Sequence, residues 1–91
     1  MTDYWIKIVE EEEEDIKRHH YLVTAIDVSE ARKAALAFLR HFCDEDDNPD
    51  PIQDGFAFYN NAIRVRIVDI KETTKEDFKN FMLKMFTIQW K

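Results

Sequence analysis

Apolar and polar residues alternate along three stretches of the chain, and this period of two predicts β-strands. The first two stretches are Tyr4–Val9 and Lys17–Ile26, and the acidic run Glu10–Asp15 separates them. Six consecutive carboxylates repel one another, so we expect a β-hairpin whose acidic turn is solvated and splayed. The third stretch, Ala62–Lys71, is the clearest strand, because branched aliphatic residues recur in it at every second position.

The strand at Ala62–Lys71 is expected to have one apolar face and one mixed face. The apolar face carries Ile63, Val65 and Ile67, and the mixed face carries Arg64, Arg66, Val68 and Ile70. Upstream of it, Phe56–Tyr59 favours a short strand, and Asn60-Asn61 predicts a tight turn because Asn tolerates positive φ. The segment Asp44–Gly55 is predicted to be a loop, since its Asn-Pro-Asp-Pro sequence disfavours a helix and a central strand.

Two further segments have the apolar spacing of helices. The first is expected to begin after the N-cap Ser29 and to end near Cys43, and its buried face comprises Ala31, Ala34, Ala35, Phe38, Leu39 and Phe42. The second is expected over Lys75–Phe86, after a capping box of Thr74 and Asp77, and buries Phe78, Phe81, Met82 and Met85. The last residues, Thr87–Lys91, are predicted to form an edge strand or a packed tail anchored by Trp90.

The order of these elements is β-β-α-β(β)-α, where the bracketed strand is the short one. It predicts an α+β fold built as one domain over residues 1–91. We expect a two-layer sandwich in which both helices cover one face of an antiparallel sheet of three to four strands. The other face of the sheet would then carry the aromatic and basic residues that the core does not use.

Composition narrows the class of protein. Hydrophobic residues make up 45% of the 91 residues, and a single glycine and two prolines argue against a disordered chain. The lone Cys43 excludes an internal disulfide and fits a reducing compartment. No apolar run approaches the ~20 residues of a membrane span, and no signal-peptide pattern is visible, so we expect a cytoplasmic protein without a membrane partner.

Negative charge is concentrated in two short blocks of the chain: the first is Glu10–Asp15, and the second comprises Asp44, Glu45, Asp46, Asp47, Asp50 and Asp54. The net charge of the chain is -6, and it would be positive if the acidic residues of those two blocks were removed. We predict that the blocks bind a basic surface of a partner protein, because spaced carboxylates can imitate phosphates. Solubility is the ordinary alternative explanation for such loops. The candidate partner-binding residues are Glu10, Glu11, Glu12, Glu13, Glu14, Asp15, Asp44, Glu45, Asp46, Asp47 and Asp50.

No catalytic signature accompanies this charge. Cys43 has no local motif of a nucleophile, and Ser29, the only serine, lies at the start of a helix. A single glycine excludes a loop that cradles phosphate. We therefore expect neither an enzyme nor a cofactor.

Metal binding is not expected either. Asp46, Asn48 and Asp50 resemble the start of a calcium loop, but Pro51 and Ala57 stand where glycine and glutamate are needed. His19 and His20 are adjacent on a strand, so their rings point to opposite faces. His41 and Cys43 are separated by ~200° around a helix, which is not a ligand spacing.

One part of the sequence resembles known proteins. Tyr4–Ala35 reads as a strand, an acidic turn, the strand Tyr21-Leu22-Val23-Thr24-Ala25 and the helix start Val28-Ser29-Glu30-Ala31. This pattern, which covers about a third of the chain, resembles small phage-encoded proteins of unknown function. In size and clustered acidity the chain is also similar to phage inhibitors of host defence such as anti-CRISPR proteins, some of which imitate nucleic acid. The resemblance implies a binding function and assigns no residue a role.

The leading interpretation is a non-enzymatic acidic module that docks on the basic, nucleic-acid-binding surface of a partner, in the manner of a phage inhibitor. A second is a self-associating accessory module, in which Thr87–Lys91 or Tyr4–Val9 pairs with its symmetry mate to give a homodimer. A third is weak nucleic-acid binding through Arg64, Arg66, Lys17 and Arg18, with Tyr4 or Trp5 flanking the arginines as stacking groups. The net acidity disfavours this third function.

Overall fold

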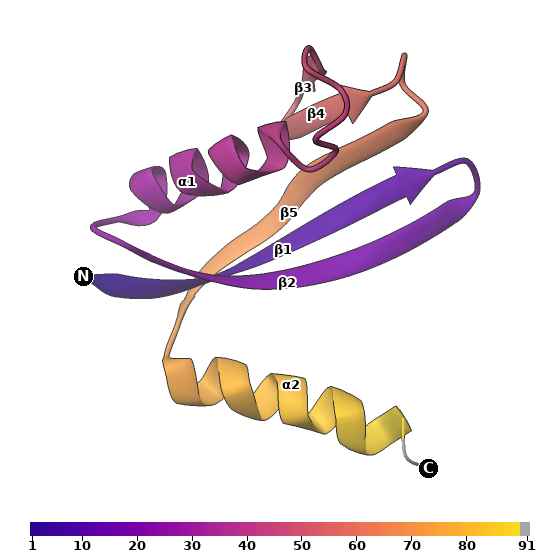
Figure 1. The fold of residues 1–91 in the computed structure, drawn as a ribbon. Helices are drawn as coiled ribbons and strands as arrows, with labels where there is room; N and C mark the ends of the chain where they lie inside the picture. Colours follow the sequence, from indigo (N-terminus) through magenta and orange to yellow (C-terminus); the bar gives the residue numbers. More distant parts are fainter. Residues whose placement is uncertain (90–91) are drawn as a thin grey trace.

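In the described part of the chain, the strands form a single antiparallel sheet of five strands (Figure 1). The computed structural model describes residues 1–89, and the side chains of residues 1–84. Along the chain, the elements are β1 (Thr2–Glu12), β2 (Asp15–Ala25), α1 (Val28–Arg40), β3 (Asp50–Ile52), β4 (Gly55–Phe58), β5 (Ile63–Thr73) and α2 (Lys75–Gln89). The strands lie in the order β2-β1-β5-β4-β3. The α+β class is confirmed, whereas the predicted count of three to four strands is too low.

The two helices lie on opposite faces of the sheet, so the prediction of a two-layer sandwich is wrong (Figure 1). Alternation along β1 is the physical reason, because it points Ile6 and Ile8 towards α1 and Trp5 towards the other face. An indole on an open sheet face would leave a large apolar ring in water. Phe78 and Phe81 of α2 cover Trp5, with ring centroids 5.7 and 4.4 Å from it.

The core lies between α1 and the sheet. The largest side chains that are fully buried there are Phe58, Ile6, Ile8, Leu39 and Val65. Burying each of them stabilises the fold by roughly 1.5–3 kcal/mol. Two alanines of α1, Ala31 and Ala35, are also buried and bring the helix close to the sheet. The predicted apolar face of β5, which carries Ile63, Val65 and Ile67, therefore packs in the core.

The hairpin between β1 and β2 is tighter than its six acidic residues predicted. Pairing continues to Glu12 and resumes at Asp15, so only Glu13 and Glu14 form the turn. Glu13 adopts a positive φ of 54°. β1 is hydrogen-bonded to β2 on one side and to β5 on the other, and this pairing holds the carboxylates in place despite their repulsion. The expectation of a splayed turn is wrong.

A β-bulge changes the faces of β5. Lys7 is opposite Asp69 and Ile8 is opposite Ile67, so Val68 is the extra residue and has no partner on β1. Beyond the bulge the alternation is inverted, and Ile70 packs against the core instead of facing away with the arginines. The prediction for Ile70 is wrong because a bulge is decided by strand pairing.

The segment before β5 forms a second, short hairpin. Pro51 lies in β3, which is an edge strand of only three residues and therefore tolerates proline. Gly55 begins β4 in close contact with β5, where an added Cβ would lie 1.8 Å from the Val65 carbonyl oxygen. Asn60 and Asn61 have positive φ values of 55° and 74°, which confirms the predicted turn. The prediction of a loop over Asp44–Gly55 is therefore wrong from Asp50 to Ile52, which form β3, and at Gly55, which begins β4.

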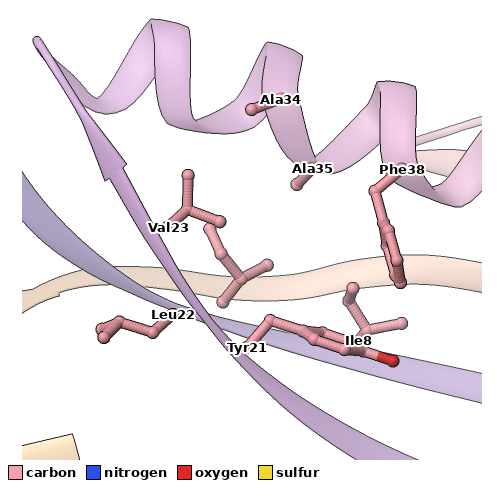
Figure 2. A pocket seen from close by; sticks show the side chains of 8 residues that line it. Ile8, Tyr21, Leu22, Val23, Ala34, Ala35 and Phe38 are labelled. Atoms are coloured by element: carbon pink, nitrogen blue, oxygen red, sulfur yellow. The ribbon is translucent and has the colours of Figure 1, made fainter.

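The ends of α1 differ from the prediction. Asp27 is the N-cap, and its Oδ1 accepts a hydrogen bond of 2.9 Å from the Glu30 backbone N–H, so the assignment of Ser29 is wrong. The helix ends at Arg40, three residues before the predicted Cys43, and His41 is its C-cap. The predicted buried residues Ala34 and Phe38 are exposed, because they lie on the side of α1 that faces the β2 edge (Figure 2).

The second helix follows its predicted start. Thr74 Oγ1 accepts a hydrogen bond of 3.0 Å from the Asp77 backbone N–H, which confirms Thr74 as the cap. The helix continues through residues 87–89, so the prediction of an edge strand over Thr87–Lys91 is wrong for these three residues. Trp90 lies outside the described residues. The side chain of Met85 also lies outside the described part. No helix in residues 1–89 is long and apolar enough to cross a membrane.

Candidate functional site

The first acidic block lies at the far end of the β1–β2 hairpin. Because side chains alternate along a strand, Glu10 lies on the α1 face and Glu11 on the α2 face. Glu10 Oε1 lies 2.8 Å from His19 Nε2 on the neighbouring strand. Glu11 Oε1 accepts a hydrogen bond of 3.2 Å from Arg66 Nε of β5. Two of the six predicted carboxylates are therefore engaged within the fold.

The second acidic block lies in the segment between α1 and β3. One of its members, Asp46, has a structural role: Oδ1 accepts from the Asn48 backbone N–H at 3.1 Å and Oδ2 from the Tyr59 backbone N–H at 2.8 Å. The second bond ties the loop to the turn that follows β4. Asp46 thereby gives the acidic segment a defined position next to the sheet.

The two acidic blocks, which are some 30 residues apart in the sequence, meet at the same end of the sheet (Figure 1). The half-buried Cys43 lies near carboxylates of both blocks. Burial raises the pKa of its thiol, and nearby carboxylates from both blocks raise it further; these are Glu10, Asp46, Glu12 and Asp44. Burial and then Glu10 likewise raise the pKa of Tyr21. The sequence predicted both blocks but did not predict that they meet.

Eight of the eleven predicted residues are exposed, and their side chains form no hydrogen bond or ion pair with other residues of the described part. We call these eight residues the acidic end: Glu12, Glu13, Glu14, Asp15, Asp44, Glu45, Asp47 and Asp50. The three others, Glu10, Glu11 and Asp46, stabilise the fold beneath them. Asp54, which completes the second block in sequence, lies apart from the acidic end because it pairs with Arg32 at 2.8 Å.

The main physical property of this end is its negative charge. A raised pKa keeps Cys43 as a thiol, whereas a nucleophile would need the thiolate. Across the described residues, no group of three or more His, Cys, Asp and Glu side chains is placed to hold a metal ion. His41 is exposed at the end of α1. His19 and His20 point to opposite faces, as predicted, since His19 contacts Phe42 and His20 contacts Trp5.

A second cluster, which the sequence did not predict, surrounds Trp5 on the α2 face. Trp5 Nε1 donates a hydrogen bond of 3.0 Å to His20 Nδ1, and Phe81 packs on both rings. Lys71 and Lys7 place their Nζ atoms 4.4 and 5.4 Å from the Trp5 ring centroid. Burial lowers the pKa of His20, and Lys7 and His19 lower it further. This cluster attaches α2 to the sheet.

Arg64 and Arg66 do not form the aromatic platform that the sequence suggested. On β5 they are opposite Glu11 and Val9 of β1, and opposite Ala57 and Gly55 of β4. Trp5 is opposite Lys71, at the other end of the strand. Because Arg66 also pairs with Glu11, the described residues offer no stack of arginine and aromatic rings for nucleic acid.

A third feature is an apolar groove between α1 and β2 (Figure 2). It has a volume of about 180 Å³, and Ile6, Ile8, Tyr21, Leu22, Val23, Ala34, Ala35 and Phe38 line it. The alanines of α1 leave this space, since their side chains do not fill the distance to β2. In the sequence, the only sign of this groove is the presence of small residues, Ala34 and Ala35, on the predicted apolar face of the helix.

No protein-family model, curated protein or solved structure matches this chain.

Proposed function

We propose that this protein is a non-enzymatic binding module whose acidic end docks on a basic surface of a partner protein. The observation that supports the proposal is the meeting of the hairpin turn and the loop after α1, which places eight exposed carboxylates without partners in the described chain at one end. Such a field steers a cationic partner and matches the surface that binds nucleic-acid phosphates.

The rigidity of the scaffold strengthens this proposal. Strand pairing up to Glu12 and the two backbone hydrogen bonds to Asp46 hold both segments before any partner arrives. A preorganised surface loses less conformational entropy on binding than a mobile loop does. The protein would compete with nucleic acid for the partner, as a phage-type inhibitor of a nucleic-acid-binding protein would.

The test compares three baits in affinity capture from a lysate of the cells that carry the gene. The first bait is the wild type, and the second is the loop variant Asp44→Asn/Glu45→Gln/Asp47→Asn. Asp46 is left unchanged in it, because Asp46 holds the backbone. The third is the matched control Asp69→Asn/Glu72→Gln/Glu76→Gln, which removes the same charge from exposed positions outside the acidic end.

We expect basic, nucleic-acid-binding proteins to be captured by the wild type and by the control. Their recovery should fall about tenfold or more with the loop variant and should decrease with rising salt. Added nucleic acid should displace them from the wild type. Equal recovery with all three baits at every salt concentration would contradict the proposal.

A further inference from the structure

Within residues 1–89, no strand pairs with the outer edge of β2. β2 is the first strand of the sheet, its one partner in the described part of the chain is β1, and its pairing over Asp15–Ala25 shows no register shift. Natural edge strands are usually short, or are blocked by charge, proline or a bulge. Charged residues occur only in the first part of β2, and Tyr21–Ala25 contains none of these protective features. The other edge strand, β3, is short and contains Pro51.

The apolar groove runs beside this free edge (Figure 2). Its floor contains Ile6 and Ile8 of β1, and Tyr21 and Val23 of β2 form its border. Phe38 of α1 is 50% exposed and packs on Tyr21, with ring centroids 4.9 Å apart. A strand added to β2 would therefore place alternate side chains against an apolar surface that is already formed.

The positive charge on β2 determines which residues an added strand should carry. Lys17 and Arg18 are exposed on β2 and have no ion pair within the described residues. On its other side, β2 already pairs with a strand of complementary pattern, since β1 places Ile6 opposite Tyr21 and Glu10 opposite Lys17. The same order of apolar and acidic residues would complement the free edge.

We propose that the free edge of β2 and the adjoining groove bind an extended segment of a partner protein, which adds a sixth strand antiparallel to β2. The segment has apolar residues opposite Tyr21 and Val23, and ends in two acidic residues opposite Arg18 and Lys17. The acidic part is short because Asp15 and the turn beyond it repel further carboxylates. This site is separate from the acidic end and does not depend on the function proposed for it.

A second copy of this chain complements the edge less well. If two β2 strands paired antiparallel over their full length, with His20 at the twofold axis, Lys17 would lie opposite Val23 and Arg18 opposite Leu22. Neither cation would then face an acidic residue, and both would lie beside apolar side chains. A partner segment that supplies carboxylates avoids this cost.

The probe is a fluorescent, end-capped peptide of sequence Thr-Val-Thr-Val-Thr-Val-Glu-Glu. Two control peptides differ from it in one property each: in one, both glutamates are replaced by lysine, and in the other, alternate backbone nitrogens are methylated. We expect saturable binding of the first peptide to the wild-type protein. Either control should bind about tenfold or more weakly, through loss of charge pairing or of backbone hydrogen bonds.

Protein variants locate the site. Ala34→Gln puts a polar side chain at the mouth of the groove, and Lys17→Glu/Arg18→Glu reverses the charge of the edge. Each should weaken binding about tenfold or more. The matched controls are Ala37→Gln, exposed on the same helix outside the groove lining, and Lys79→Glu/Lys84→Glu on α2, and both should leave the affinity unchanged. Amide hydrogen exchange of β2 should slow when the peptide is bound.

Three outcomes would overturn this proposal, and each can be read on the wild-type protein alone. The first is no binding of the glutamate peptide, and the second is equal binding of the lysine or methylated peptide. The third is a dimer in sedimentation whose β2 amides are protected without peptide, which would assign the edge to a second copy. None of these outcomes bears on the capture experiment with the acidic end.

Discussion

Asp46 shows that residues of one type in one loop have different tasks. Its carboxylate accepts two backbone hydrogen bonds, whereas Asp44 and Asp47 are exposed and have no partner within the described residues. At the level of sequence the three residues are equivalent members of an acidic run. Only the position of the Tyr59 backbone N–H distinguishes them, because that group reaches the loop from a different part of the chain.

The protonation of a second residue, His20, should affect the stability of the folded protein. Its Nδ1 accepts from Trp5 Nε1, and protonation would convert this acceptor into a donor and abolish the bond. Burial lowers the pKa of His20 in the folded protein, so the folded state binds fewer protons than the unfolded state. The stabilisation is therefore present above the unfolded value of about 6.5 and is lost as the pH falls through and below that value.

We predict that the Tm falls between about pH 7.5 and about pH 5.5, and that part of this fall is absent in His20→Asn. Asn retains an acceptor but does not titrate. A hydrogen bond worth about 1 kcal/mol corresponds to roughly 4–8 °C in a domain of this size. Thermal unfolding followed by circular dichroism at both pH values measures the difference. If both proteins lose the same number of degrees, His20 is not the group responsible.

The elements of the fold were easiest to predict where a local pattern decides them. Period-two alternation identified β1, β2 and β5, and the Thr74 cap identified the start of α2. The predictions were wrong where contacts with a distant segment of the chain determine the local structure. The bulge at Val68 follows from pairing with β1, and the two-residue turn at Glu13 and Glu14 persists because β5 holds β1 on its other side.

The N-cap of α1 should contribute measurably to the stability of the protein. Asp27→Ala removes the acceptor of the Glu30 backbone N–H and should destabilise the protein by about 1 kcal/mol, or roughly 4–8 °C in Tm. Ser29→Ala is the control, since Ser29 lies within the first turn and should change the Tm little. Thermal denaturation of both variants decides the assignment. A larger loss for Ser29→Ala than for Asp27→Ala would refute Asp27 as the cap.

For the whole molecule, the distribution of charge has a cost in stability. The ion pairs of the described residues include Arg32–Asp54 and Lys33–Glu30, which are exposed and worth ~0.2–1 kcal/mol each, and the more buried His19–Glu10. None of them involves the eight residues of the acidic end. Those carboxylates therefore repel one another in the folded state, and a basic partner would relieve this repulsion.

We predict that the loop variant Asp44→Asn/Glu45→Gln/Asp47→Asn unfolds at a higher temperature than the wild type at low salt. The gain should be a few degrees, on the order of 0.5 kcal/mol, and should disappear near 0.5 M salt because exposed charges are then screened. The control Asp69→Asn/Glu72→Gln/Glu76→Gln should not gain stability, since lysines neighbour these residues in the sequence. An unchanged or lower Tm of the loop variant at low salt would show that repulsion is not stored at this end.

By itself the sequence determined the class of fold, the apolar face of β5 before the bulge and the segments that carry the acidic charge. These are local properties, because side-chain alternation, helix caps and runs of glutamate do not depend on distant partners. Only the tertiary structure decided that β1 is an inner strand of the sheet and that β2 is an edge strand, which removes Tyr4–Val9 as a self-pairing strand. It also decided that the two acidic blocks meet and that a groove opens beside β2, because strand order and the placement of α1 depend on contacts between segments far apart in the chain.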